Sequence, residues 1–87
     1  MHIVSQRNIR VGRMTIKVLD LRGLKCPLPV LKTRKAMKEL VSGTQIWVET
    51  TDPLSVIDMP NYCQESGHRL LETTKDDDML RFLIEKA

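Results

Sequence analysis

The chain has 87 residues, of which 41% are hydrophobic and 29% are charged, and its formal net charge is +3. This length provides for one small domain and leaves no room for a separate cofactor-binding domain. No run of about 18 apolar residues is present to span a membrane, and the N-terminus lacks the apolar core of a secretory signal, so we expect a cytoplasmic protein. We also expect both cysteines, Cys26 and Cys63, to be reduced thiols.

The first thirteen residues are basic and contain no acid. A β-like run begins at Met14, so we expect residues 1–13 to be a flexible basic extension and residues 14–87 to be a single domain. The weak alternation of Ile3, Ile9 and Val11 leaves an additional edge strand open as an alternative.

The remaining elements follow from periodicity and from turn residues. We predict strands over 16–21, 45–50, 69–74 and 79–85, and helices over 27–41 and from Asp52-Pro53 to Ser66. Pro60 is expected to kink or break the second helix near Asp58. Gly43 and Gly67 suit the left-handed position after a helix. The order β-α-β-α-β-β predicts an α+β fold: a two-layer α/β sandwich in which two helices pack on one face of a four-stranded mixed sheet.

The predicted packing assigns apolar positions to two faces. In the first helix, apolar residues recur at near-helical spacing and are expected to form one side: Leu28, Leu31, Met37, Leu40 and Val41. The open face of the sheet is expected to carry Trp47 and Leu83, with Leu19 and Leu21 as further candidates, either as a partner surface or as ordinary partly exposed residues.

Cys26 is the principal candidate for chemistry. It precedes Pro27, a residue favoured at the first helical position, so we expect Cys26 to be the N-cap, with its sulfur at the positive end of the helix dipole. Arg22 and Lys25 add positive charge, and both effects lower a thiol pKa. Position 29 is Pro29, which excludes a Cys-x-x-Cys dithiol. The alternative is that Cys26 is a small buried hydrophobic residue.

Charge is distributed unevenly along the chain. Residues 1–42 carry a net charge of +8 and residues 43–87 a net charge of −5, and six cations with no acid lie between Arg22 and Lys38. A basic stripe on the first helix, consisting of Lys32, Arg34, Lys35 and Lys38, is therefore a candidate for docking acidic partners. The alternative is a solvated helix face.

Other polar residues favour structural roles. Cys63 is expected to fill the core, with a second carrier thiol as the alternative, and His68 is expected to be a hydrogen-bonded structural residue. Asp76, Asp77 and Asp78 are expected to form a hairpin turn. The two cysteines and two histidines show no metal-ligand spacing, so no metal site is expected.

The run from Asp20 to Val30, followed by Thr51-Asp52-Pro53, Asp58-Met59-Pro60 and Gly67 to Leu71, resembles the TusA/SirA-like sulfur-carrier family with its Cys-Pro-x-Pro motif. The resemblance covers about residues 16–86. It implies the same β-α-β-α-β-β fold and a persulfide on Cys26 as the only group carried, with no separate cofactor. The expected activity is that of a sulfurtransferase, and Arg22, Lys25, Pro27, Leu28 and Pro29 are expected to support the persulfide.

The resemblance also implies protein partners. A cysteine desulfurase or rhodanese-like donor would supply the sulfur and an acceptor relay protein would receive it, as in tRNA thiolation, cofactor maturation or sulfur oxidation. A monomer is expected, with no direct nucleic-acid or membrane contact. The alternatives are a small basic nucleic-acid-binding or regulatory module, and a thiol peroxidase or redox sensor. Against nucleic-acid binding, the chain has only three aromatic residues for base stacking.

Overall fold

A computed structural model describes residues 5–11 and 14–87 of the chain. Two helices and five strands follow one another in the order β1 Ser5–Val11, β2 Met14–Asp20, α1 Leu28–Lys38, β3 Gln45–Thr50, α2 Ser55–Ser66, β4 Arg69–Asp76 and β5 Met79–Glu85. None of the described helices is long and apolar enough to cross a membrane.

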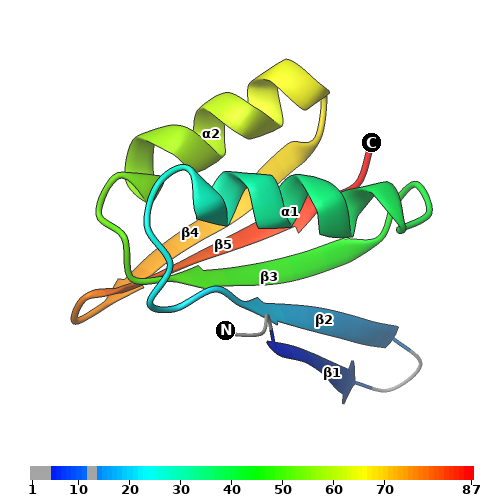
Figure 1. Ribbon diagram of the computed structural model, residues 1–87. Helices are drawn as coiled ribbons and strands as arrows, with labels where there is room; N and C mark the ends of the chain where they lie inside the picture. Colours follow the sequence, from blue (N-terminus) through cyan, green and yellow to red (C-terminus); the bar gives the residue numbers. More distant parts are fainter. Residues whose placement is uncertain (1–4, 12–13) are drawn as a thin grey trace.

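The strands form one mixed sheet in the order β1-β2-β3-β5-β4, and both helices lie on the same face of it (Figure 1). Strands β2 and β3 are parallel and are connected through α1, whereas β5 is antiparallel to both β3 and β4. The predicted two-layer α+β architecture is therefore confirmed. The parallel pairing of β2 and β3 has a direct consequence for function, because the loops that follow two neighbouring parallel strands emerge at the same edge of the sheet.

The sheet has five strands where four were expected. The additional strand β1 pairs antiparallel with the outer edge of β2, in a register that joins Ser5 to Asp20 and Val11 to Met14. An edge strand over residues 5–11 is thus present, as the alternation of Ile9 and Val11 had left open. It forms because the edge of β2 opposite β3 presents unpaired backbone groups to a neighbouring extended segment. The mobility of residues 1–13 and a domain boundary at residue 14 stay predictions, and residues 1–4, 12 and 13 lie outside the described residues.

The core lies between the sheet and the helices. Its buried members include Leu19, Leu21, Met37, Ile46, Val48, Met59, Tyr62, Cys63, Leu80, Phe82 and Ile84. Leu19 and Leu21 therefore face the helices, and the expectation that they lie on the open face was wrong. That face carries Trp47 and Leu83, which are direct neighbours on β3 and β5 and are both partly buried.

Only part of the apolar set predicted for the first helix is in the core: Met37 is buried and Leu40, just after α1, packs against the core. Pro29, Thr33 and Met37 are buried, whereas Leu28, Leu31 and Val41 are 42%, 50% and 76% exposed. The threonine hydroxyl is accommodated in the core because it donates a hydrogen bond of 2.8 Å to the carbonyl of Pro29, one turn earlier. The leucines at the N-terminal half of α1 are therefore on the surface.

Helix α2 begins later than predicted and is not broken. The chain makes a turn at Pro53 and Leu54 before the helix begins at Ser55, and the helix continues across Pro60 to Ser66. Burial of Met59, Tyr62 and Cys63 on both sides of Pro60 holds this helix against the sheet despite the missing N–H. Gly67 ends the helix in the left-handed conformation, with φ of 82°, as predicted.

Candidate functional site

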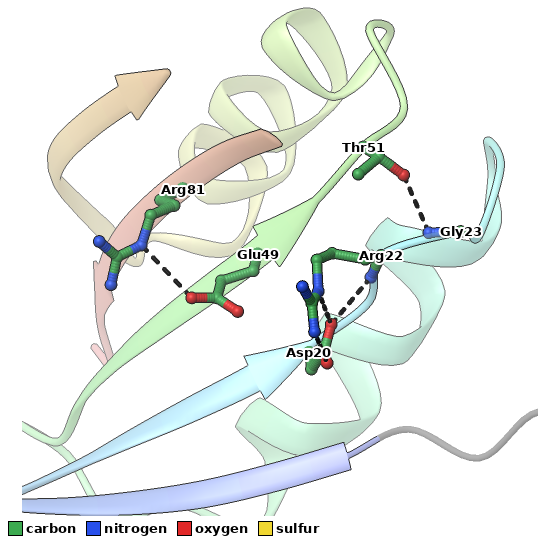
Figure 2. Close-up of polar contacts among 6 residues, drawn as sticks. All are labelled: Asp20, Arg22, Gly23, Glu49, Thr51 and Arg81. Atoms are coloured by element: carbon green, nitrogen blue, oxygen red, sulfur yellow. Dashed lines mark hydrogen bonds and ion pairs between the residues drawn. The ribbon is translucent and has the colours of Figure 1, made fainter. Parts of the chain in front are cut away.

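The loop that carries Cys26 is fastened to the loop that follows β3. The N–H of Gly23 donates a 2.9 Å hydrogen bond to the hydroxyl of Thr51, as Figure 2 shows. The N–H of Cys26 donates to Oδ2 of Asp52, and Oδ1 of the same carboxylate accepts a 3.2 Å hydrogen bond from the N–H of Leu54. The backbone of this loop is therefore held at Gly23 by a side chain 28 positions further along the chain and at Cys26 by one 26 positions further along.

The helix begins one residue later than the sequence predicted. Pro27 is the N-cap, so Cys26 lies just before the cap, and the peptide bond between the two is cis. The N–H of Leu28 donates to the carbonyl of Lys25 at 2.8 Å. That amide is thus used within the turn. The support of the persulfide expected from Leu28 stays a prediction. Pro29 lies in the first helical turn and is buried, so its part is to anchor the helix start in the core.

Of the two cations expected beside the sulfur, Arg22 is paired with Asp20 and Lys25 lines a different hollow. Figure 2 shows Arg22 folded back onto Asp20, with Nε and Nη2 each 2.8 Å from the carboxylate. Lys25 lines a separate hollow of about 230 Å³ together with Gly23, Leu24, Thr51, Asp52 and Pro53. Neither cation lines the groove in which Cys26 lies.

Cys26 is exposed and lies in an open groove between the start of α1 and one face of α2. The groove has a volume of about 290 Å³ and is lined by Cys26, Pro27, Val30, Asp58, Asn61, Tyr62 and Glu65. Its charged groups are therefore two carboxylates from α2. A reacting group of another molecule can reach the sulfur from solvent through this groove.

The carboxylates make the surroundings of the sulfur unfavourable for a thiolate. Hydrogen bonding of the thiol to the Asp58 carboxylate raises the pKa of Cys26, and partial desolvation together with the negative charges of Asp58 and Asp52 raises it further. The expected lowering of this pKa by the helix dipole, Arg22 and Lys25 was therefore wrong. The cause is tertiary: α2 brings Asp58 to the sulfur, while Arg22 is occupied by Asp20.

The second cysteine occupies a different environment. Cys63 is 2% exposed within the core, and burial raises the pKa of its thiol to about 11. The core-filling role predicted for Cys63 is confirmed. The structural role expected of His68 agrees with its hydrogen bonding, since its Nδ1 accepts a 3.0 Å hydrogen bond from the N–H of Ala87.

The four cations of the basic stripe differ in exposure and in surroundings. Arg34, Lys35 and Lys38 are exposed and Lys32 is half-buried. Arg34 lies over the ring of Tyr62, with Cζ 5.1 Å from the ring centroid, so it faces α2. Arg34 and Lys38 line a hollow beside α2, and Lys35 lies outside it. No group of three or more His, Cys, Asp or Glu side chains placed to hold a metal occurs in the part of the chain that the structure describes.

Sequence reasoning missed Asp52 and Asp58 as members of the site. Both lie in segments that carry the family resemblance, Thr51-Asp52-Pro53 and Asp58-Met59-Pro60, but neither was assigned a role at the sulfur. A signal for Asp52 was available, because β2 and β3 were predicted to be parallel neighbours and residues 22–26 and 51–53 follow them directly. No local pattern placed Asp58 beside Cys26, because its approach depends on the packing of α2 against α1.

Comparison with known proteins is consistent with this geometry. The family described as Sulfurtransferase TusA matches residues 17–86. The chain belongs to this family. It is 46% identical over 71 residues to the putative sulfur carrier protein YrkI of Bacillus subtilis, an alignment that covers 82% of this chain and 95% of the relative.

Two further relatives carry the family name. The sulfur carrier protein TusA of Buchnera aphidicola is 38% identical over 70 residues, covering 80% of this chain and 89% of the relative. The protein of the same name from Allochromatium vinosum is 38% identical over 69 residues, covering 79% and 91% respectively. The matched family segment contains the whole loop of Cys26, and also Asp52 and Asp58, whose carboxylates raise the pKa of its thiol.

The acidic surroundings of Cys26 predict a specific pH dependence of alkylation. The midpoint of the alkylation rate against pH should lie above the usual thiol value of about 8.5. Asp58→Asn should lower this midpoint and accelerate alkylation at pH 7, because it removes the carboxylate that stabilises the protonated thiol. Glu65→Gln, which removes a charge from the same groove, should change the midpoint less.

The measurement is the rate of iodoacetamide labelling of Cys26 between pH 6 and 11, followed by peptide mass spectrometry. A wild-type midpoint below the usual value, or equal midpoints for the wild type and Asp58→Asn, would contradict the assignment of Asp58.

Proposed function

We propose that this protein is a sulfurtransferase that carries sulfane sulfur as a persulfide on Cys26 and relays it from a donor protein to an acceptor protein. The observation that carries the proposal is the contrast between the two thiols: Cys26 is exposed in an open groove, whereas Cys63 is buried. Membership of the TusA family supports the sulfur-carrying role. A cysteine desulfurase or rhodanese-like protein is the proposed donor.

The chemistry is an exchange in which atoms and electrons balance. The Cys26 sulfur attacks the outer sulfur of a donor persulfide, R–S–SH, forming a new S–S bond while the donor S–S bond breaks. The donor thiol leaves as R–SH, and the thiol proton of Cys26 is transferred to the departing sulfur or to water. Transfer to the acceptor repeats the exchange with Cys26–S–SH as the donor, and no net oxidation occurs.

The position of Cys63 protects the loaded state. A second accessible thiol beside Cys26 would attack the persulfide and discharge its sulfur by forming a disulfide. Cys63 is enclosed in the core and its thiol remains protonated near neutral pH, because burial raises its pKa to about 11. The sulfur on Cys26 therefore stays available to a partner protein.

The acidic groove keeps the reactivity of the Cys26 thiol low while no partner is bound. The thiolate is the attacking form, and Asp58 and Asp52 disfavour it. In the absence of a bound partner, Cys26 is therefore mainly a thiol at neutral pH. A partner that places a cation near Asp58 and Glu65 would reverse this effect within the docked complex. Activation of the sulfur is thereby coupled to docking.

Intact mass spectrometry tests the assignment of the carrier sulfur. After incubation with a cysteine desulfurase and cysteine, the wild type and Cys63→Ser should each gain the mass of one sulfur atom, and Cys26→Ser should gain none. Treatment with dithiothreitol should remove the gain. Loading of Cys26→Ser to the wild-type level would refute the proposal.

The exposed cations of α1 are proposed to guide acidic partners. Lys35→Glu should slow sulfur transfer about threefold or more at low ionic strength, because long-range attraction acts mainly on the association rate. Lys75→Glu makes the same charge change on the exposed edge strand β4 and serves as the control. Both variants should unfold at nearly the wild-type temperature, since exposed charges contribute about 0–1 kcal/mol to stability.

Transfer rates measured in low and high salt with one donor decide this point. Equal rates for Lys35→Glu and Lys75→Glu at low salt would show that the stripe is only a solvated helix face.

A further inference from the structure

A second hollow lies beside the groove of Cys26. It has a volume of about 230 Å³, and its lining comes from α1, α2, the turn after α2 and the segment after β5: Arg34, Met37, Lys38, Tyr62, Ser66, His68 and Lys86. The hollow shares only Tyr62 with the groove of Cys26. It is therefore a separate place on the surface that takes no part in the chemistry at the sulfur, although Arg34 and Lys38 also belong to the basic stripe proposed to guide acidic partners.

The lining of this hollow is cationic. Arg34, Lys38 and Lys86 contribute three positive charges, and no carboxylate is among the lining residues. None of these three cations forms an ion pair with an acid in the described part of the chain. Three like charges that line one hollow from α1 and the C-terminal segment repel one another, and a bound anion would relieve that repulsion.

Two of the lining groups are held in place before any ligand binds. The guanidinium of Arg34 lies over the ring of Tyr62 at 5.1 Å from its centroid, and that tyrosine is buried. The backbone of Lys86 is fixed on both sides, because its N–H donates to Thr44 at 2.7 Å and its carbonyl accepts from Gly43 at 2.9 Å. The positions from which these two cations extend are thus set by the fold.

His68 adds a donor to the lining. Its Nδ1 accepts the hydrogen bond from the N–H of Ala87, so a neutral ring carries its proton on Nε2. Burial and the nearby charge of Lys86 lower the pKa of His68, which keeps the ring neutral at physiological pH. Tyr62 and Ser66 also line the hollow, and the Ser66 hydroxyl donates a 2.7 Å hydrogen bond to the carbonyl of Tyr62.

We propose that this hollow binds a doubly charged tetrahedral oxyanion, either a free phosphate or sulfate ion or the phosphate group of a larger molecule. The arginine fork, two ammonium groups and a neutral imidazole N–H supply donors from several directions, an arrangement that suits a tetrahedral dianion better than a planar carboxylate. The volume leaves space beyond a single oxyanion, so a phosphomonoester can also enter. The site goes beyond the sulfur-carrier role and does not depend on it.

The test is a titration of the ¹⁵N-labelled full chain with inorganic phosphate, sulfate and glycerol 3-phosphate at constant ionic strength. The amide signals of Ser66, His68 and Lys86 should shift and saturate. Arg34→Gln and Lys86→Gln should each weaken binding about tenfold, or about 1.4 kcal/mol. Lys35→Gln, which removes a charge from the same helix outside the hollow, should stay within about twofold of the wild type.

The two oxyanion sources are distinguished by affinity. Tighter binding of glycerol 3-phosphate than of phosphate identifies a phosphorylated molecule as the ligand, and equal or weaker binding identifies the free ion. Shifts that do not saturate, or an equal loss of affinity in Lys35→Gln, would overturn the proposal. Tighter saturable binding of a glutamate-rich peptide than of any oxyanion would also overturn it, in favour of a docking surface for acidic proteins.

Discussion

The carboxylate of Asp52 connects the two loops on which the site depends. One oxygen accepts the N–H of Cys26, the other accepts the N–H of Leu54, and the Asp52 carbonyl accepts the N–H of Ser55 at 3.0 Å. The same side chain therefore fixes the residue that carries the sulfur and the turn that begins α2. Because α2 supplies Asp58 and Tyr62 to the groove, the position of the sulfur relative to its surroundings follows from this one group.

Acidic and basic residues occupy different parts of the surface between the two helices. Next to Cys26 the charges are negative and keep the free thiol protonated, whereas beyond Tyr62 they are positive. A carrier with a permanently ionised, exposed sulfur would be alkylated and oxidised by small molecules. If the proposed function is correct, cations placed away from the sulfur would attract partners or anions without activating the thiol.

The sequence predicted those features that arise from local chemistry and periodicity. The order of strands and helices, the left-handed Gly67 and the hairpin strand Met79–Glu85 all follow from patterns within a few residues. The errors arise where distant segments meet. The burial of Thr33 in place of Leu31 depends on how α1 lies on the sheet, and the pKa of Cys26 depends on Asp58, 32 positions away. The pairing of β1 was visible only as a weak alternation.

Hydrogen exchange at the amide of Cys26 tests the central role of Asp52 most directly. In the wild type this amide should be protected, since its N–H is bonded to the carboxylate. In Asp52→Ala its protection should fall about tenfold or more, which corresponds to about 1.4 kcal/mol, while the core amides of Val48 and Phe82 keep theirs. A Cys26 amide that exchanges as fast as an unstructured one in the wild type, or equally in both proteins, would contradict this account.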